Sequence, residues 1–186
     1  MTTLRTIDIA TINTEKVFNM YSVKLMDGDE GIITQIIPKM IELVLRDSKD
    51  KEIIDIAKSC KKNTDIETVR SILSFVSKNF THQQESPDEQ MIVAPIHLIT
   101  KNFHRGSVSI NTLTAAMLLS LGFAVNIKIL AWREPLEDGI SPFTHIHLEC
   151  YIPSFGKHVA IDPVNYSEIP FVNPFKIIRQ QSFIIE

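Results

Sequence analysis

The sequence predicts an α/β (α+β) domain in which a helical N-terminal part precedes a central helix packed on a small antiparallel sheet. Apolar residues recur at helical spacing in several segments between residues 34 and 80, which predicts amphipathic helices. Residues 109–121 form a further apolar segment, in which Ala115 and Ala116 allow close packing at the centre of a domain. Residues 124–162 then alternate as strands do and contain a tight turn, which predicts the sheet.

The N-terminal region is expected to be an extended arm followed by two helices. Residues 1–27 alternate loosely, mainly from residue 4 onward, which favours an extended arm or edge strands. A helix should begin near Thr34, with Pro38 in its first turn, where a missing N–H is tolerated. The second helix, about residues 49–62, carries Cys60 on its apolar face, so this cysteine is predicted to be a core residue and not a catalytic thiol.

The third helix begins with a capping box, because Thr64 and Glu67 can satisfy each other's free backbone amides. Its buried face is predicted to comprise Ile66, Val69, Leu73, Val76 and Phe80. Residues 81–95 are mostly polar and are expected to form a loop that ends at Pro95.

The central helix is predicted over about residues 109–121, and Gly122 is suited to the left-handed position that follows a helix. The strand expected at residues 124–132 is almost entirely apolar, which indicates burial on both faces. Cys150 lies on the apolar face of the next strand and is predicted to belong to the core.

The hairpin at residues 144–162 carries polar side chains on one face, at His145, His147, Glu149 and Tyr151. The turn Pro153–Gly156 makes Ile152 a partner of Lys157. In that register Asp162 lies opposite His147 and diagonal to His145, within carboxylate–imidazole reach of either ring.

Composition narrows the class of function. The chain has 186 residues, a net charge of −3 and scattered basic residues, which gives no hint of a nucleic-acid-binding surface. No segment approaches the ~20 apolar residues of a membrane span, and the N-terminus lacks the apolar core of a signal peptide. Two cysteines are too few for a disulfide framework and indicate a reducing compartment.

Several motifs resemble, in order and spacing, the core of the transglutaminase-like superfamily, which has the papain-like fold. Residues 118–122 resemble the Leu-Leu-x-x-Leu-Gly end of that family's helix. Residues 145–149 resemble its His-x-aromatic-x-Glu strand, and residues 160–163 resemble its acid strand. The family's catalytic cysteine commonly lies fifteen residues before the glycine, a position that Ser107 occupies here.

Upstream segments, from Gly31 to Pro95, resemble the N-terminal half of short single-domain versions that are common in bacteriophage genomes. The resemblance covers about residues 28–165. It implies an extended N-terminal arm (1–27), a transglutaminase-like domain (28–165) and an extended C-terminal tail (166–186).

The departures from the family's pattern bear directly on activity. The Gly-Asp-Cys triplet of the family is Arg105-Gly106-Ser107 here, so the acid and the thiol are both replaced. His147 replaces the aromatic residue of the histidine strand, and a two-residue shift of the helix would put Ser109 at the nucleophile position. A cysteine paired with histidine ionises near neutrality, whereas a serine needs an aligned base and oxyanion hole.

The resemblance therefore implies a remnant triad of Ser107, His145 and Asp162. The leading hypothesis is a catalytically inactive transglutaminase-like domain, a pseudoenzyme, that serves as a structural or binding component of a phage particle or its assembly, for example at the head–tail region. Its partners would be other proteins or further copies of itself, with no nucleic acid and no membrane, in the cytoplasm or the virion. The alternative is an active serine hydrolase or acyltransferase that cleaves or transfers amide or ester groups through the same triad.

A metal site is a third hypothesis, because His145, His147 and Asp162 could supply the two histidines and one carboxylate that suit zinc or iron. Histidines at strand spacing are more often solvated, so no metal and no cofactor is expected. The sequence does not select an oxyanion donor among Lys101, Asn102 and His104.

Overall fold

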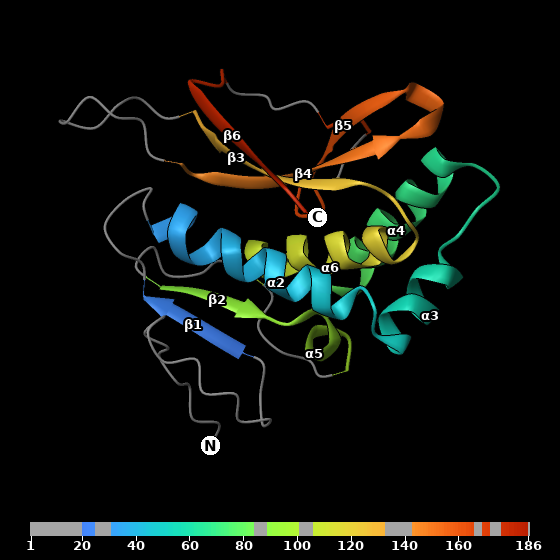
Figure 1. Ribbon diagram of the computed structural model, residues 1–186, viewed down its shortest axis with the longest axis horizontal. Helices are drawn as coiled ribbons and strands as arrows, with labels where there is room; N and C mark the ends of the chain where they lie inside the picture. The colour runs from blue at the N-terminus through green and yellow to red at the C-terminus, as the bar shows by residue number, and fades with distance from the viewer. Residues whose placement is uncertain are drawn as a thin grey trace.

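The computed structural model describes residues 20–24, 31–83, 89–100, 106–132, 143–165, 169–171 and 176–185. Helix α6 (Ser107–Ser120) runs through the middle of this part of the molecule (Figure 1). A four-stranded antiparallel sheet covers one side of α6, and other helices and a two-stranded sheet lie on the opposite side. The fold is therefore the mixed α/β architecture that the sequence predicts.

The central helix is buried on all sides, since every residue from 108 to 118 is shielded from solvent. Its buried polar residues, such as Thr112 and Thr114, donate their hydroxyl groups to carbonyls one turn earlier in the helix, which makes this burial tolerable. It begins at Ser107, earlier than the predicted residue 109, because Gly106 is extended and acts as its N-cap. Gly122 has a φ of +87° and donates its N–H to the carbonyl of Leu119, so the predicted left-handed end is confirmed.

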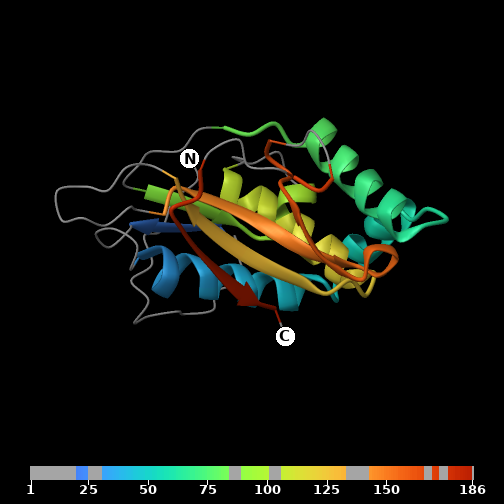
Figure 2. The ribbon, with the colours of Figure 1, turned by 90° about the horizontal axis from the view of Figure 1, so that it is seen from above.

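Three further helices pack against α6, with α2 and α4 on either side of it (Figure 2): α2 (Ile37–Asp47), α3 (Lys51–Ser59) and α4 (Asp65–Asn79). A π-helical segment, η1 (Ile32–Ile36), leads into α2, so the first helix begins before the predicted Thr34. Pro38 has no N–H with which to close the bond to the carbonyl of Thr34, which is consistent with irregular helix before it. Cys60 is 5% exposed and belongs to the core, as predicted.

The capping box at the start of α4 is only half formed. Thr64 Oγ1 accepts the N–H of Glu67 at 3.3 Å, as predicted. The Glu67 carboxylate, however, accepts the Thr64 hydroxyl at 2.9 Å and not the Thr64 backbone N–H. The hydroxyl can donate to this carboxylate while it accepts the amide, so the two side chains satisfy each other.

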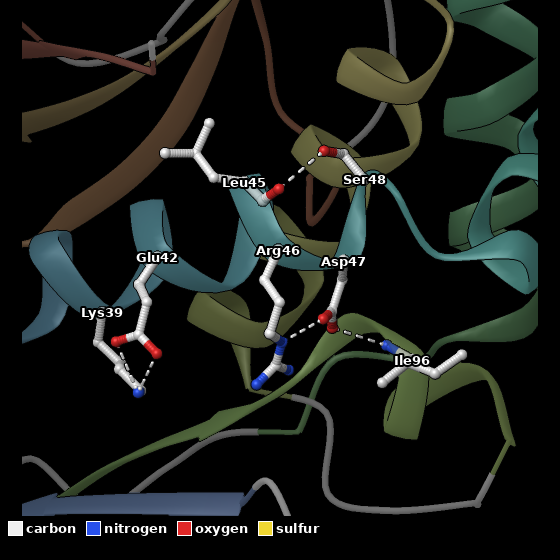
Figure 3. Close-up of polar contacts among 7 residues, drawn as sticks. All are labelled: Lys39, Glu42, Leu45, Arg46, Asp47, Ser48 and Ile96. Atoms are coloured by element: carbon white, nitrogen blue, oxygen red, sulfur yellow. Dashed lines mark hydrogen bonds and ion pairs between the residues drawn. The ribbon is translucent and has the colours of Figure 1, made fainter. Parts of the chain in front are cut away.

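The predicted polar loop at residues 81–95 was wrong in its last third. Residues Glu89–Val93 form strand β2, which pairs antiparallel with β1 (Met20–Lys24), and helix α5 (Pro95–Thr100) follows. The partner strand is remote in the sequence, so local polarity could not reveal the pairing. The carboxylate of Asp47, which is 3% exposed, accepts the N–H of Ile96 at 3.2 Å and ties α2 to α5 (Figure 3).

The four-stranded sheet has the order β5-β4-β3-β6. Its strands are β3 (Val125–Ala131), β4 (His145–Ile152), β5 (Lys157–Ile161) and β6 (Arg179–Ile184). Ile152 pairs with Lys157, so the predicted hairpin register is confirmed. Figure 2 shows the sheet lying across the helices, with β6 from the predicted C-terminal tail at its edge. None of the described helices is long and apolar enough to cross a membrane.

Candidate functional site

The end of the hairpin brings a buried carboxylate against a histidine. Asp162 follows β5 directly and is 1% exposed. Its Oδ2 lies 2.8 Å from Nε2 of His145, the first residue of β4. The diagonal contact is therefore with His145, whereas the alternative contact to His147 does not form.

The carboxylate of Asp162 is held from its other side by the turn that follows. Oδ1 accepts the backbone N–H groups of Val164 at 2.9 Å and Asn165 at 3.1 Å, and Oδ2 accepts the Asn165 side-chain amide at 3.0 Å. Burial alone would raise the pKa of Asp162, but the contact with His145 and the bonds from Asn165 outweigh it, so the pKa lies below its usual value. Asp162 is accordingly an oriented, ionised partner for an imidazole.

The ring of His145 is enclosed by aromatic side chains. Its centroid lies 4.9 Å from that of Trp132 and 6.2 Å from that of Phe171. The distance between His145 Nε2 and Asp162 Oδ2 is that of an ion pair. With Nε2 directed at Asp162, Nδ1 is the ring nitrogen left to act on a group elsewhere.

Ser107 occupies the first turn of α6, where backbone N–H groups have no partner within the helix. No side chain caps this end. The Asn111 amide donates to the carbonyls of Ser107 at 2.9 Å and Ile146 at 3.2 Å, which holds the start of α6 beside β4. Among the described residues, no hydrogen bond reaches the Ser107 hydroxyl, from His145 or from any other side chain.

Ser109, the alternative nucleophile position, has a structural role. It is fully buried, and its hydroxyl accepts the N–H of Val93 at 2.9 Å and donates to the carbonyl of Met91 at 3.1 Å. Both bonds fix β2 to the central helix. A hydroxyl engaged in this way is not available as a nucleophile.

Buried polar atoms without a hydrogen-bond partner gather around the start of β4. In the described part of the chain they belong to Asn111, Thr144, His145 and His147. Buried polar groups in native proteins are nearly always satisfied, so a cluster of exceptions indicates a place where water or a ligand binds. Sequence reasoning missed Asn111 and Thr144, although an asparagine within an otherwise apolar helix was a usable signal for the first.

The remaining predicted residues fall outside this arrangement. The Glu149 carboxylate, on the polar face of the hairpin, accepts hydrogen bonds from Lys128 Nζ at 2.8 Å and from the Ser182 hydroxyl at 3.1 Å. Cys150 is fully buried, as predicted, and burial raises the pKa of its thiol to about 12. Lys101, Asn102 and His104 lie outside the described residues.

The metal hypothesis gains no support from this geometry. Within the described ranges, no three His, Cys, Asp or Glu side chains are arranged to hold a metal ion. Asp162 is already occupied by His145 and by the turn that follows it.

A central helix, a histidine strand and an acid strand follow one another in the order that the resemblance to the transglutaminase-like superfamily predicts. A chain of Parabacteroides distasonis described as a candidate protease has a similar structure, with a TM-score of 0.50 and 13% identity over 73% of this chain and 26% of its own. A structure described as a TGase matches with a TM-score of 0.42 and 14% identity, over 73% of this chain and 34% of its own. The chain thus spans about a quarter to a third of the length of the structures that it matches.

No protein-family model matches the sequence, and no curated protein matches it. At 13% identity the structural likeness concerns the fold. The reaction, if there is one, must be argued from the side chains of this chain.

Proposed function

We propose that this chain is a transglutaminase-like domain without acyl-transfer activity, which serves as a binding or structural component. One observation carries the proposal: the hydroxyl of Ser107, at the position of the family's nucleophile, has no hydrogen-bond partner among the described residues. A serine attacks a carbonyl only while a base removes its proton, so the nucleophile and the base must lie within hydrogen-bond reach.

The replacement of the thiol adds to this argument. A cysteine at the start of a helix is a thiolate near neutral pH and needs no proton transfer during attack. Serine gains much less from the same helix end, because its hydroxyl stays protonated at any physiological pH. The site therefore keeps a base and an acid without the nucleophile that they served.

A viral particle or its assembly is the proposed setting, and the partners are other proteins or copies of the same chain. Support for this setting comes from the resemblance of residues 28–165 to short phage-type domains. Under this proposal the chain co-sediments with purified particles after nuclease treatment. A chain found only in the soluble fraction would contradict the particle-bound form of the proposal.

A second candidate function, an active Ser107-His145-Asp162 hydrolase or acyltransferase, is favoured by the His145–Asp162 contact of 2.8 Å. Orientation of an imidazole by a buried carboxylate is the feature that serine hydrolases use to prepare their base. Nucleophile–base distances are often long in unliganded sites and shorten when substrate binds. The two candidates therefore differ in whether Ser107 reacts.

The deciding experiment is labelling of folded protein with a fluorophosphonate probe, which reacts with activated serines. We expect no labelling of the wild type above that of Ser107→Ala, with both proteins shown to be folded by circular dichroism. The matched control is Ser120→Ala, at the other end of the same helix, which should label as the wild type does. Labelling that disappears only in Ser107→Ala would overturn the proposal in favour of the hydrolase.

A further inference from the structure

The outer face of the four-stranded sheet holds a cavity of about 100 Å³ beside the remnant triad. We propose that this cavity is a binding site for a small neutral group that carries a hydroxyl or an amide, with His147 as its hydrogen-bonding residue. The site is separate from the chemistry of Ser107. It goes beyond the proposed function, because it assigns a ligand class to a place that neither candidate function uses.

The cavity combines polar and apolar walls. It is lined by Lys128, Leu130, His147, Glu149, Ala160 and Phe171, together with Ile177 and Gln180. A water molecule occupies about 30 Å³ in the liquid, so the space suits a group of roughly three or four non-hydrogen atoms. Leu130 and Phe171 give such a group an apolar surface to pack against.

His147 is the buried polar residue whose hydrogen-bonding groups a ligand in this cavity would satisfy. It is 4% exposed, and neither ring nitrogen has a hydrogen-bond partner in the part of the chain that the structure describes. The rings of His145 and Phe171 lie 5.9 Å away and cover it without bonding to it. An unsatisfied buried polar group costs about 1–3 kcal/mol, a cost that a bound polar group removes.

The charges that line the cavity favour a neutral ligand over an ionic one. Lys128 Nζ and Glu149 Oε1 are 2.8 Å apart and compensate each other, so the wall carries no net charge from this pair. Burial and the neighbouring His145 lower the pKa of His147 to about 4, so the imidazole is neutral at physiological pH. An anion or a cation in this cavity would have no counter-charge, which makes its transfer from water costly.

Hydrogen-bonding chemistry narrows the class further. A neutral imidazole has one N–H donor and one acceptor nitrogen. Hydroxyl and primary amide groups can donate and accept, so they match whichever nitrogen faces the cavity. A purely apolar group of the same size would leave His147 unsatisfied.

The test uses the full chain and four probes of similar size: acetamide and ethanol as neutral groups, acetate and methylammonium as ions. Binding is followed by the ¹⁵N and ¹H shifts of the histidine side chains during titration. Acetamide and ethanol are expected to bind with millimolar dissociation constants, as small ligands do, and to shift the His147 resonances first. Acetate and methylammonium are expected to bind at least about tenfold more weakly.

Variants separate recognition from folding. His147→Phe is expected to weaken acetamide binding by about tenfold or more, whereas His147→Gln, which keeps a donor and an acceptor, should stay within about fivefold of the wild type. The matched control is His82→Phe, a change at an exposed histidine after α4, which should leave binding unchanged.

Three results would overturn the site: no shift of His147 with any probe, tighter binding of an ionic probe, or unchanged acetamide binding in His147→Phe. If His147→Phe does not fold, the His147→Gln titration and the comparison of neutral with ionic probes still test whether the cavity binds neutral groups through His147. Because the readout is independent of Ser107, fluorophosphonate labelling of the same sample shows whether the proposed loss of activity holds.

Discussion

The two faces of strand β4 both contain buried side chains, but these side chains differ in chemistry. The inner face, against α6, carries Leu148, Cys150 and Ile152, each with 0% exposure. The outer face carries His145 and His147, of which His147 is 4% exposed. The side chains on the inner face are apolar, and their removal from water stabilises the fold.

The side chains that are buried on the outer face are polar. Desolvated imidazoles and a buried carboxylate cost free energy unless each finds a partner. Asp162 has its partners, and His147 has none among the described residues. The inner face thus explains why the domain folds, whereas the outer face holds groups that folding alone does not require.

The largest effect on stability is expected from a substitution on the inner face of β4. Leu148→Ala should lower the free energy of unfolding by roughly 2–5 kcal/mol, because it leaves a cavity between the sheet and α6. Urea unfolding followed by circular dichroism measures the change. Tyr151→Ala, at an exposed position on the same strand, is the control and should cost far less. Equal losses in the two variants would mean that the inner face does not dominate stability.

On the outer face, His147 makes stability depend on pH. Its pKa is about 4 in the folded protein, mainly through burial and then through the charge of His145, against an ordinary value of 6.5. The unfolded chain therefore binds the extra proton first, and stability falls as pH drops from about 6.5 to about 4. The loss should approach roughly 3 kcal/mol, from about 1.4 kcal/mol per pH unit.

The measurement is the difference in unfolding free energy between the wild type and His147→Phe at several pH values. Groups that titrate in both proteins, such as Asp162 and Glu149, largely cancel in this difference. The variant should show a flatter profile between pH 4 and 6.5. Parallel profiles would mean that His147 is hydrated and titrates normally.

The carboxylate of Asp162 is expected to contribute less than the inner face. Asp162→Ala leaves the backbone N–H groups of Val164 and Asn165 without their acceptor, which should cost roughly 2 kcal/mol. Asn165→Ala removes only one side-chain bond to Oδ2 and should cost less. Thermal unfolding at pH 7 compares the two, and a larger loss for Asn165→Ala would show that the turn, and not the carboxylate, holds this end of the hairpin.

The smallest effect on stability is expected at the start of α6, where Ser107→Cys should change the unfolding free energy by less than about 0.5 kcal/mol. Its effect on chemistry should be large, because the helix N-terminus lowers the pKa of a thiol below about 8.5. Iodoacetamide alkylation as a function of pH measures that pKa, and the buried Cys150, with a pKa raised to about 12, should stay unreactive.

A second substitution tests whether His145 acts on the residue at position 107. If Nδ1 of His145 faces the nucleophile position, adding His145→Ala to Ser107→Cys should raise the thiol pKa by about one unit. An identical pH profile with and without His145 would show that the family's nucleophile position and its base are not joined in this chain.

Parts of this fold and site follow from local rules. The 145–161 hairpin was predictable because its alternation and its turn fix the register, and the register alone brought Asp162 to His145. The end of α6 at Gly122 was predictable because a left-handed residue after a helix favours glycine. Strand β2 was not, because its pairing with β1 depends on residues far upstream.

The sequence by itself determined the helices between residues 37 and 79, the central helix, the 145–161 hairpin, the burial of both cysteines and the absence of a thiol at position 107. Periodicity and turn chemistry act over a few residues, so a sequence displays them directly. Only the tertiary structure decided that Ser109 is tied to β2. It also decided that, among the residues that the structure describes, the Ser107 hydroxyl and both nitrogens of His147 have no hydrogen-bond partner. Those properties depend on which distant segments exclude water from a side chain, and packing in three dimensions sets them.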